Sequence, residues 1–384
     1  MPLASDQPNK RIELVYTKRP GILSATTAFR RLAVAVSLSA MVLPGMAAAN
    51  PMMVVDVGSG RVIAHEEAFR KWYPASLTKL MTAYTTFRSM RSGELSPETV
   101  VVMSKHAADQ PASKMYFRPG SKLTLDSALK LLIIKSANDV AVAIGETVSG
   151  SEAAFVQRMN QEAARLGMTS TRFVNPNGLP GKGQYTTARD MALLATTIRR
   201  EFPEYAGYFA LEGVTTGKKD YPNFNLLVGR FPGADGMKTG YVCASGFNQV
   251  SSATRNGRTI ISVVLGADSL GARADLSADL LQKGLTTSVA GNRLDQLAPY
   301  GEGQDQVTDI SAEICNPKAR QIRSEGRDEA GRMKLTSPYI REMGRPPAMS
   351  FAGLIPGSEP VETKQGSGTG EIANVPIPRP RPTF

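Results

Sequence analysis

The stretch Pro74-Ala75-Ser76-Leu77-Thr78-Lys79-Leu80-Met81-Thr82 decides the fold of this chain. A proline at the start, followed by apolar residues at helical spacing, predicts a helix that carries Ser76 in its first turn. Residues three apart on a helix lie on the same face. We therefore expect the hydroxyl of Ser76 and the amine of Lys79 to lie within hydrogen-bond reach.

Two further short strings follow in order, Ser136-Ala137-Asn138 and Lys238-Thr239-Gly240. Taken alone, an S-x-x-K string is weak evidence, because about one chance match is expected in a chain of this length. The three strings together supply a nucleophile, a base, a second hydroxyl, an amide and a cationic clamp for a carboxylate. This set suffices for acyl transfer at serine without any histidine.

The proposed base needs a special environment. A lysine with an ordinary pKa near 10.4 is protonated at neutral pH and cannot accept a proton. Burial, the positive end of a helix or a neighbouring cation can lower that pKa. We expect Lys238 to be the neighbouring cation for Lys79.

The pattern along the chain predicts an α+β fold. Residues 53–64 read as a strand hairpin, and helical spacing covers 123–146 (interrupted at 135–138), 152–166 and 187–200. After Gly236 the chain is rich in valine and isoleucine, and Asn256-Gly257 predicts a two-residue hairpin turn. Because a lone hairpin is marginal in water, strands from the two ends are expected to pair in one antiparallel sheet. Lys238-Thr239-Gly240 is expected to open one of these strands.

The two ends of the chain differ from the middle. Residues 1–49 contain Arg30-Arg31, an apolar run and Ala47-Ala48-Ala49, which favours a cleaved export signal over a membrane-spanning helix because the run is short and contains Pro44. Residues 286–345 give weak signals. Residues 346–384 are rich in proline and glycine and predict a disordered or extended tail.

Composition narrows the function. The 384 residues carry a net charge of +11, which on its own is compatible with a non-catalytic binder of nucleic acid or cell wall. The two histidines have no metal-ligand spacing, so we expect no metal site. The only cysteines, Cys243 and Cys315, are open to two readings, a disulfide or a free buried Cys243 on a strand.

A family resemblance rests on the three strings together with three further stretches, Asn175-Pro176-Asn177-Gly178-Leu179, Thr187-Ala188-Arg189-Asp190-Met191 and Gly236-Met237-Lys238-Thr239-Gly240-Tyr241. With these, residues 50–285 resemble the low-molecular-mass penicillin-binding proteins, specifically the D-alanyl-D-alanine carboxypeptidases. The resemblance implies the penicilloyl-serine transferase (β-lactamase-like) fold, an antiparallel sheet flanked by helices plus an all-α subdomain. It also implies bacterial peptidoglycan stem peptides ending in D-Ala-D-Ala as substrates, β-lactams as covalent inhibitors, and no cofactor.

The resemblance assigns roles residue by residue. It makes Ser76 the nucleophile, Lys79 its base and Ser136 the proton relay to the leaving D-alanine. Asn138 would hold the substrate amide, Lys238 and Thr239 the terminal carboxylate, and Gly240 would allow close approach of the strand. The backbone N–H groups of Ser76 and Tyr241 would form the oxyanion hole. Arg273 matches an arginine of carboxylate recognition, with a surface arginine as the alternative.

The sequence distinguishes a carboxypeptidase from a class A β-lactamase but not from an endopeptidase. Class A β-lactamases carry S-D-N and a deacylating glutamate in an E-x-x-L-N string, whereas this chain has Ala137 and no such string between Ser136 and Lys238. Endopeptidases that cut peptidoglycan crosslinks use similar residues and stay as an alternative. The terminal amphipathic helix common in the family is not recognisable here, so membrane attachment is doubtful. The export signal predicts the periplasm or the outer face of the cytoplasmic membrane.

Overall fold

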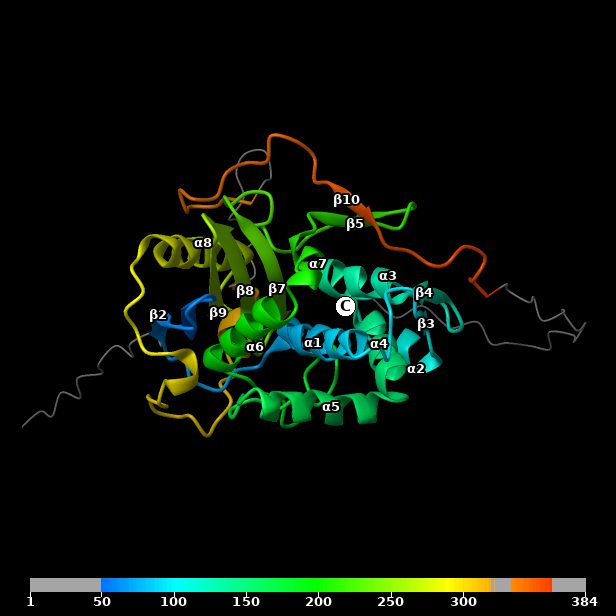
Figure 1. Cartoon of the computed structure of the whole chain (residues 1–384), viewed down its shortest axis with the longest axis horizontal. Coiled ribbons are helices and arrows are strands. Elements are labelled where there is room, and N and C mark those ends of the chain that lie inside the picture. The colour runs from blue at the N-terminus through cyan, green and yellow to red at the C-terminus, as the bar shows by residue number, and fades with distance from the viewer. Residues whose placement is uncertain (1–49, 319–320, 322–332, 361–384) are drawn as a thin grey trace, which may run out of the picture. The chain divides into compact units, whose positions relative to one another are not determined.

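The computed structural model describes residues 50–318, 321 and 333–360. Its main sheet has five antiparallel strands in the order β2-β1-β9-β8-β7 (Figure 1). The strands are β1 (Met52–Asp56), β2 (Val62–Glu66), β7 (Ala234–Val242), β8 (Gly246–Arg255) and β9 (Arg258–Ala267). Because β1 pairs with β9, the predicted pairing of strands from the two ends of the helical segment is confirmed. The predicted export signal in residues 1–49 lies outside the described residues.

The hairpin turn that joins two strands of this sheet could be predicted from the sequence. The turn between β8 and β9 places Asn256 at φ 50° and Gly257 at φ 74°, the left-handed conformation that a two-residue hairpin turn requires. One expectation was wrong: Lys238 lies in the middle of β7 and does not open it. The strand begins earlier because Ala234 and Gly236 already pair with β8.

Helices pack on both faces of the sheet. The helices are α1 (Thr78–Arg91), α2 (Lys105–Ala108), α3 (Leu125–Lys130), α4 (Asn138–Ser149), α5 (Glu152–Arg165), α6 (Ala188–Glu201), α7 (Gly207–Ala210), α8 (Leu270–Thr286) and α9 (Ser311–Cys315). Short helical turns of other types are Ala75–Leu77, Leu131–Lys135, Pro203–Tyr205 and Leu294–Gln296. Ser76 therefore lies in a 3₁₀ turn that leads into α1. Among the described residues, none of these helices combines the length and apolarity that a membrane crossing needs.

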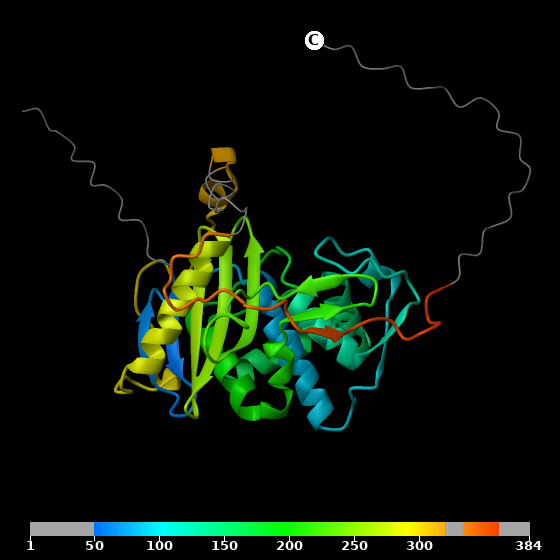
Figure 2. The same ribbon diagram turned by 90° about the horizontal axis from the view of Figure 1, so that it is seen from above.

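The core has two parts, which position the site between them. The larger part surrounds α1, where even the polar side chains of Thr78, Lys79 and Thr82 are buried, and it includes α4 and α6. The second part lies between the opposite face of the sheet and α8 (Figure 2), and it includes Ile260, Val264 and Ala278. The 3₁₀ turn that carries Ser76, just before α1, thus meets the edge strand β7 at the boundary of the sheet and the helices.

The C-terminal segment returns over the rest of the described chain. Its strand β10 (Met349–Phe351) pairs in parallel with β5 (Gly213–Thr215), which in turn pairs with β6 (Asp220–Pro222). Farther on, Ile355 N–H donates to the carbonyl of Lys122 beside β4 (Lys122–Thr124), the partner of β3 (Val100–Val102). The predicted tail therefore does not begin at residue 346, because residues 346–360 find backbone partners on the core. Residues 361–384 lie outside the described residues.

The two cysteines form a disulfide between Cys243 and Cys315, with Cα atoms 5.6 Å apart. Cys243 lies just after β7, in the turn toward β8, and is partly exposed. The reading of Cys243 as a free buried residue on a strand was therefore wrong.

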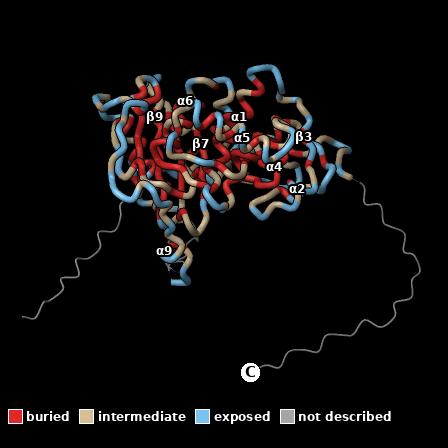
Figure 3. Tube along the Cα trace, turned by 90° about the horizontal axis from the view of Figure 1, so that it is seen from below, coloured by how far each residue is buried: buried red, intermediate tan, exposed pale blue. Residues whose placement is uncertain are grey.

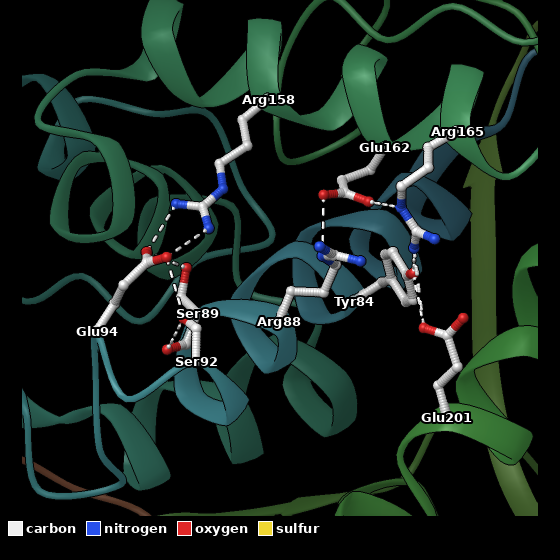
Figure 4. Close-up of polar contacts among 9 residues, drawn as sticks. All are labelled: Tyr84, Arg88, Ser89, Ser92, Glu94, Arg158, Glu162, Arg165 and Glu201. Carbon is white, nitrogen blue, oxygen red and sulfur yellow. Dashed lines mark hydrogen bonds and ion pairs between the residues drawn. The ribbon is translucent and has the colours of Figure 1, made fainter.

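A network of ion pairs joins α1, α5 and α6 (Figure 4). The largely buried carboxylate of Glu162 accepts from Arg88 at 3.0 Å and from Arg165 at 2.7 Å. Arg165 also contacts the hydroxyl of Tyr84, which lies 2.9 Å from a carboxylate oxygen of Glu201. Burial, together with Glu201, raises the pKa of Tyr84 to about 12, so this hydroxyl stays protonated and can donate. The network thus ties the helix of the nucleophile to its neighbours.

We predict that Glu162→Ala lowers the free energy of unfolding by about 1–3 kcal/mol, because two guanidinium groups lose a shared, largely buried acceptor. Urea denaturation monitored by circular dichroism measures the change. Lys105→Ala, which breaks a fully exposed ion pair with Asp109, is the control and should leave the denaturation midpoint unchanged. Equal midpoints for the two variants would contradict the prediction.

Candidate active site

Ser76 and Lys79 lie together as the helical spacing predicts. Lys79 Nζ is 3.1 Å from Ser76 Oγ, 2.8 Å from Asn138 Oδ1 and 2.6 Å from the carbonyl oxygen of Asn177. A neutral amine has two N–H donors and one lone pair. The amide and carbonyl oxygens can only accept, so they take both donors. The lone pair is then left facing the hydroxyl of Ser76.

The backbone at the nucleophile is held in an unusual conformation. Ala75 has φ 47°, a left-handed value that costs energy for a residue with a side chain. Two glycines allow other segments to approach this turn. A Cβ at Gly240 would lie 3.0 Å from Ser76 N, and a Cβ at Gly178 would lie 1.9 Å from the carbonyl oxygen of Ala75. Gly178 also has φ +84°. The turn is therefore clamped between β7 and the 175–179 loop.

Ser136 faces the lysine of the third string. It has φ 59° at the break between the turn Leu131–Lys135 and α4, which is where the sequence predicts an interhelical break. Lys238 Nζ donates to Ser136 Oγ at 3.0 Å and to the carbonyl of Thr239 at 2.9 Å. The structure thus joins the second and third strings directly, and Asn138 joins the second to the first.

A cleft opens at this junction, with a volume of about 470 Å³. Its lining includes all the residues predicted for the site except Lys79 and Lys238, which are buried beneath it; the predicted residues in the lining are Ser76, Ser136, Asn138, Thr239, Gly240, Tyr241 and Arg273. The aromatic side chains of Phe224 and Phe247 also line the cleft. The predicted residues therefore share one hollow.

Arg273 is not a surface residue, so that alternative for it was wrong. It is only 2% exposed, and Nη2 donates to the carbonyl of Phe224 at 3.2 Å. Its Nε is buried without a hydrogen-bond partner among the described residues. A buried guanidinium with donors to spare at the wall of a cleft suits the binding of an anion.

The electrostatics of the site favour a neutral Lys79. Burial, reinforced by the charge of Lys238, lowers the pKa of Lys79 well below its ordinary value, and Asp139 opposes this shift. Burial and the charge of Arg273 lower the pKa of Lys238 to about 7. Burial lowers the pKa of Arg273 to about 9. The second cation expected beside Lys79 is thus present at Lys238.

Two residues that sequence reasoning left without a role support the site. Asp139 is fully buried and accepts from the N–H groups of Met115 and Tyr116 at 2.8 and 3.1 Å, and burial raises its pKa. It thereby holds the segment whose Ala112 and Ser113 line the cleft. Asn177 supplies the carbonyl that accepts from Lys79. The sequence could have pointed to both residues through their neighbours. Asp139 directly follows Asn138, and Asn177 belongs to a stretch already quoted for the resemblance.

In the part of the chain that the structure describes, no group of three or more histidine, cysteine, aspartate or glutamate side chains is arranged to hold a metal ion.

Comparison with known proteins places this geometry in a family. The sequence profile of peptidase family S11, described as D-alanyl-D-alanine carboxypeptidase, matches residues 39–269. The chain belongs to this family. Among S11 relatives, it is 37% identical to the D-alanyl-D-alanine carboxypeptidase DacC of Escherichia coli K12 over 243 residues, which is 62% of this chain and 61% of DacC. It is 31% identical to DacA of Haemophilus influenzae over 78% of this chain and 80% of the relative.

Solved S11-type structures share the fold. Penicillin-binding protein 5 from Haemophilus influenzae superposes with a TM-score of 0.60 at 32% identity, covering 64% of this chain and 72% of that one. Penicillin-binding protein D2 from Listeria monocytogenes, solved in an ampicillin-bound form, gives a TM-score of 0.55 at 29% identity over 62% of this chain and 98% of that one. The α+β, β-lactamase-like fold predicted from the sequence is therefore confirmed.

We predict that Gly178→Ala slows acylation of Ser76 at least about tenfold, because its Cβ would collide with the carbonyl of Ala75 and displace the nucleophile. Gly167→Ala is a matched control: Gly167 has φ +74°, but no atom lies within 4 Å of its added Cβ. Acylation is followed with a fluorescent penicillin. Equal rates in the two variants would show that the clash at Gly178 does not reach the nucleophile.

We predict a bell-shaped pH dependence of kcat/KM. Acid protonates Lys79 and removes the base, whereas a rise in pH through about 7 discharges Lys238 and weakens carboxylate binding in the free enzyme. Lys238→Gln should move the acid limb to higher pH, since a cation that lowers the Lys79 pKa is gone, and should remove the fall near pH 7. Lys135→Gln removes a cation outside this pair and should leave the acid limb in place. An acid limb unmoved in Lys238→Gln would contradict the coupling.

Proposed function

We propose that this chain is a serine-type D-alanyl-D-alanine carboxypeptidase, which removes the terminal D-alanine from peptidoglycan pentapeptide stems through an acyl-serine intermediate. The observation that carries the proposal is the buried amine of Lys79, which lies 3.1 Å from Ser76 Oγ and within hydrogen-bond distance of two carbonyl oxygens, those of the Asn138 side chain and the Asn177 backbone. The catalytic domain is proposed to span residues 50–285. The aligned region covers 61% of DacC, so activity and substrates are inferred from the site itself.

The acylation step follows from the contacts. Lys79 takes the proton of Ser76 as Oγ attacks the carbonyl carbon of the penultimate D-alanine. The backbone N–H groups of Ser76 and Tyr241 stabilise the oxyanion, a contribution typically worth about 3–4 kcal/mol for each donor. The C–N bond then breaks, and a proton reaches the leaving amine through Ser136, whose hydroxyl lies 3.0 Å from Lys238 Nζ.

The substrate is held by polar groups on both sides of the cleft. Lys238, Thr239 and Arg273 bind the terminal carboxylate, and Asn138 holds the amide of the acyl part. Water attacks the acyl-enzyme in the second half of the reaction, with Lys79 again accepting a proton. The region between Ser136 and Lys238 carries no E-x-x-L-N glutamate, so β-lactams are proposed to acylate Ser76 and to leave slowly, as inhibitors.

The place of action is proposed from the sequence. The signal in residues 1–49 would export the chain to the periplasm or the outer face of the cytoplasmic membrane of a bacterium. Substrate and inhibitor are both found there. The mechanism uses the carboxylate pocket and the nucleophile, and we propose no nucleic-acid partner.

We predict that the wild-type protein releases one D-alanine from a disaccharide pentapeptide and that Ser76→Ala releases none, because the variant has no nucleophile. Mass spectrometry of the peptide measures the loss. Thermal unfolding of Ser76→Ala beside the wild type is the control for folding. Release by Ser76→Ala, or none by wild type, would reject the proposal. Cleavage of a purified crosslinked dimer would instead favour the endopeptidase.

A further inference from the structure

The edge strand β7 gives the substrate a direction. β7 is the outermost strand of its sheet, so its free edge can accept an extended peptide. Under the proposed function, the terminal carboxylate binds at Thr239 and the reacting carbonyl faces the N–H of Tyr241. The peptide therefore runs antiparallel to β7, and the residues before the penultimate D-alanine lie toward Val242 and Cys243.

At that end of the cleft lies a short element from the C-terminal region. Cys243 is joined to Cys315 at the end of α9, and the hydroxyl of Tyr241 is 3.3 Å from Cys315 Sγ. The ring of Tyr241 packs on Phe247, with centroids 4.4 Å apart, and both side chains line the cleft. The side chain of Tyr241 thus connects the disulfide to the wall of the cleft.

Among the described residues, α9 has few noncovalent contacts with the main body. Figure 3 shows α9 standing out from the main body of the described chain. Ile314 is its one buried residue, and Ile310 N–H donates to the carbonyl of Ala244 at 3.2 Å. A helix of five residues is not stable by itself in water. The covalent bond, which spans 72 residues of sequence, is therefore the main constraint on this element.

We propose that the Cys243–Cys315 disulfide and α9 form a specificity element that holds Tyr241 as the wall for the acyl part of the substrate. This proposal rests on the proposed function for the direction of the peptide. Peptides that extend well beyond the penultimate D-alanine reach this wall, whereas short ones do not. Opening the disulfide frees α9 and the side chain of Tyr241, while the pairing of Tyr241 with Phe247 keeps its backbone N–H in the sheet. Long peptides then lose affinity, and the chemical step at Ser76 is kept.

The test compares a pentapeptide stem with the short N-acetyl-D-alanyl-D-alanine, using oxidised protein and protein reduced by dithiothreitol. The reductant supplies two electrons and two protons, becomes a cyclic disulfide and leaves two thiols on the protein. On reduction we expect KM for the pentapeptide to rise about three- to tenfold, with KM for the short peptide and kcat for both within about twofold. Re-oxidation should restore the original KM.

The double variant Cys243→Ser/Cys315→Ser is the matched control. It should behave as the reduced protein and ignore dithiothreitol, and thermal unfolding will show whether it stays folded. A second readout does not depend on peptide hydrolysis: reduction should slow acylation of Ser76 by benzylpenicillin, which has a bulky acyl side chain, more than by 6-aminopenicillanic acid, which has none.

The outcomes separate the two proposals. Equal changes in KM for long and short peptides, together with equal changes for the two penicillins, would overturn the specificity element. A response of the double variant to dithiothreitol would overturn it as well. If no peptide is hydrolysed by the oxidised protein but the penicillins differ as expected, the proposed function fails and the wall at Tyr241 stands.

Discussion

The site depends on keeping one lysine uncharged inside the protein. Lys79 has no exposed surface, and its amine is surrounded by Ser76, Asn138 and the carbonyl of Asn177. Charging it would place two buried lysine cations side by side, since Lys238 lies close enough to lower its pKa. A neutral amine avoids this repulsion and gains the lone pair that the reaction needs. The same arrangement explains why no histidine is required.

Two buried lysines also oppose folding. The folded pKa of each lies below the ordinary value near 10.4, so the unfolded chain binds more protons in the interval between the two values. For Lys238 that interval runs from about 7 to about 10.4, and its contribution to stability falls as the pH falls through it. The large core around α1 and the ion pairs of Glu162 offset this cost. Packing and ion pairs outside the cleft thus compensate for the free-energy cost of burying two lysines within it.

Much of this could be predicted from the sequence because the signals were local. Helical spacing brought Ser76 and Lys79 together, and Asn256-Gly257 fixed the β8–β9 hairpin. The close approach at Gly178 could not be predicted, because it depends on contact with Ala75 from a distant part of the chain. The burial of Arg273 depends likewise on how α8 packs against the sheet. The pairing of β10 with β5 was not predicted, because it involves only three residues and they lie in a segment rich in proline and glycine.

The C-terminal region changes how the cleft can be understood. Helix α9 is bonded to the end of β7, and β10 pairs with β5 and not with a separate domain. The disulfide falls just after the strand of Lys238, and β5 contacts the turn Leu131–Lys135 that precedes Ser136. Under the proposed specificity element, substrate affinity depends on more than the three strings, because the wall beside Tyr241 is held by Cys315, 72 positions from Cys243. Relatives that share the strings but lack Cys243 and Cys315 would keep the chemistry and need another means to fix that wall.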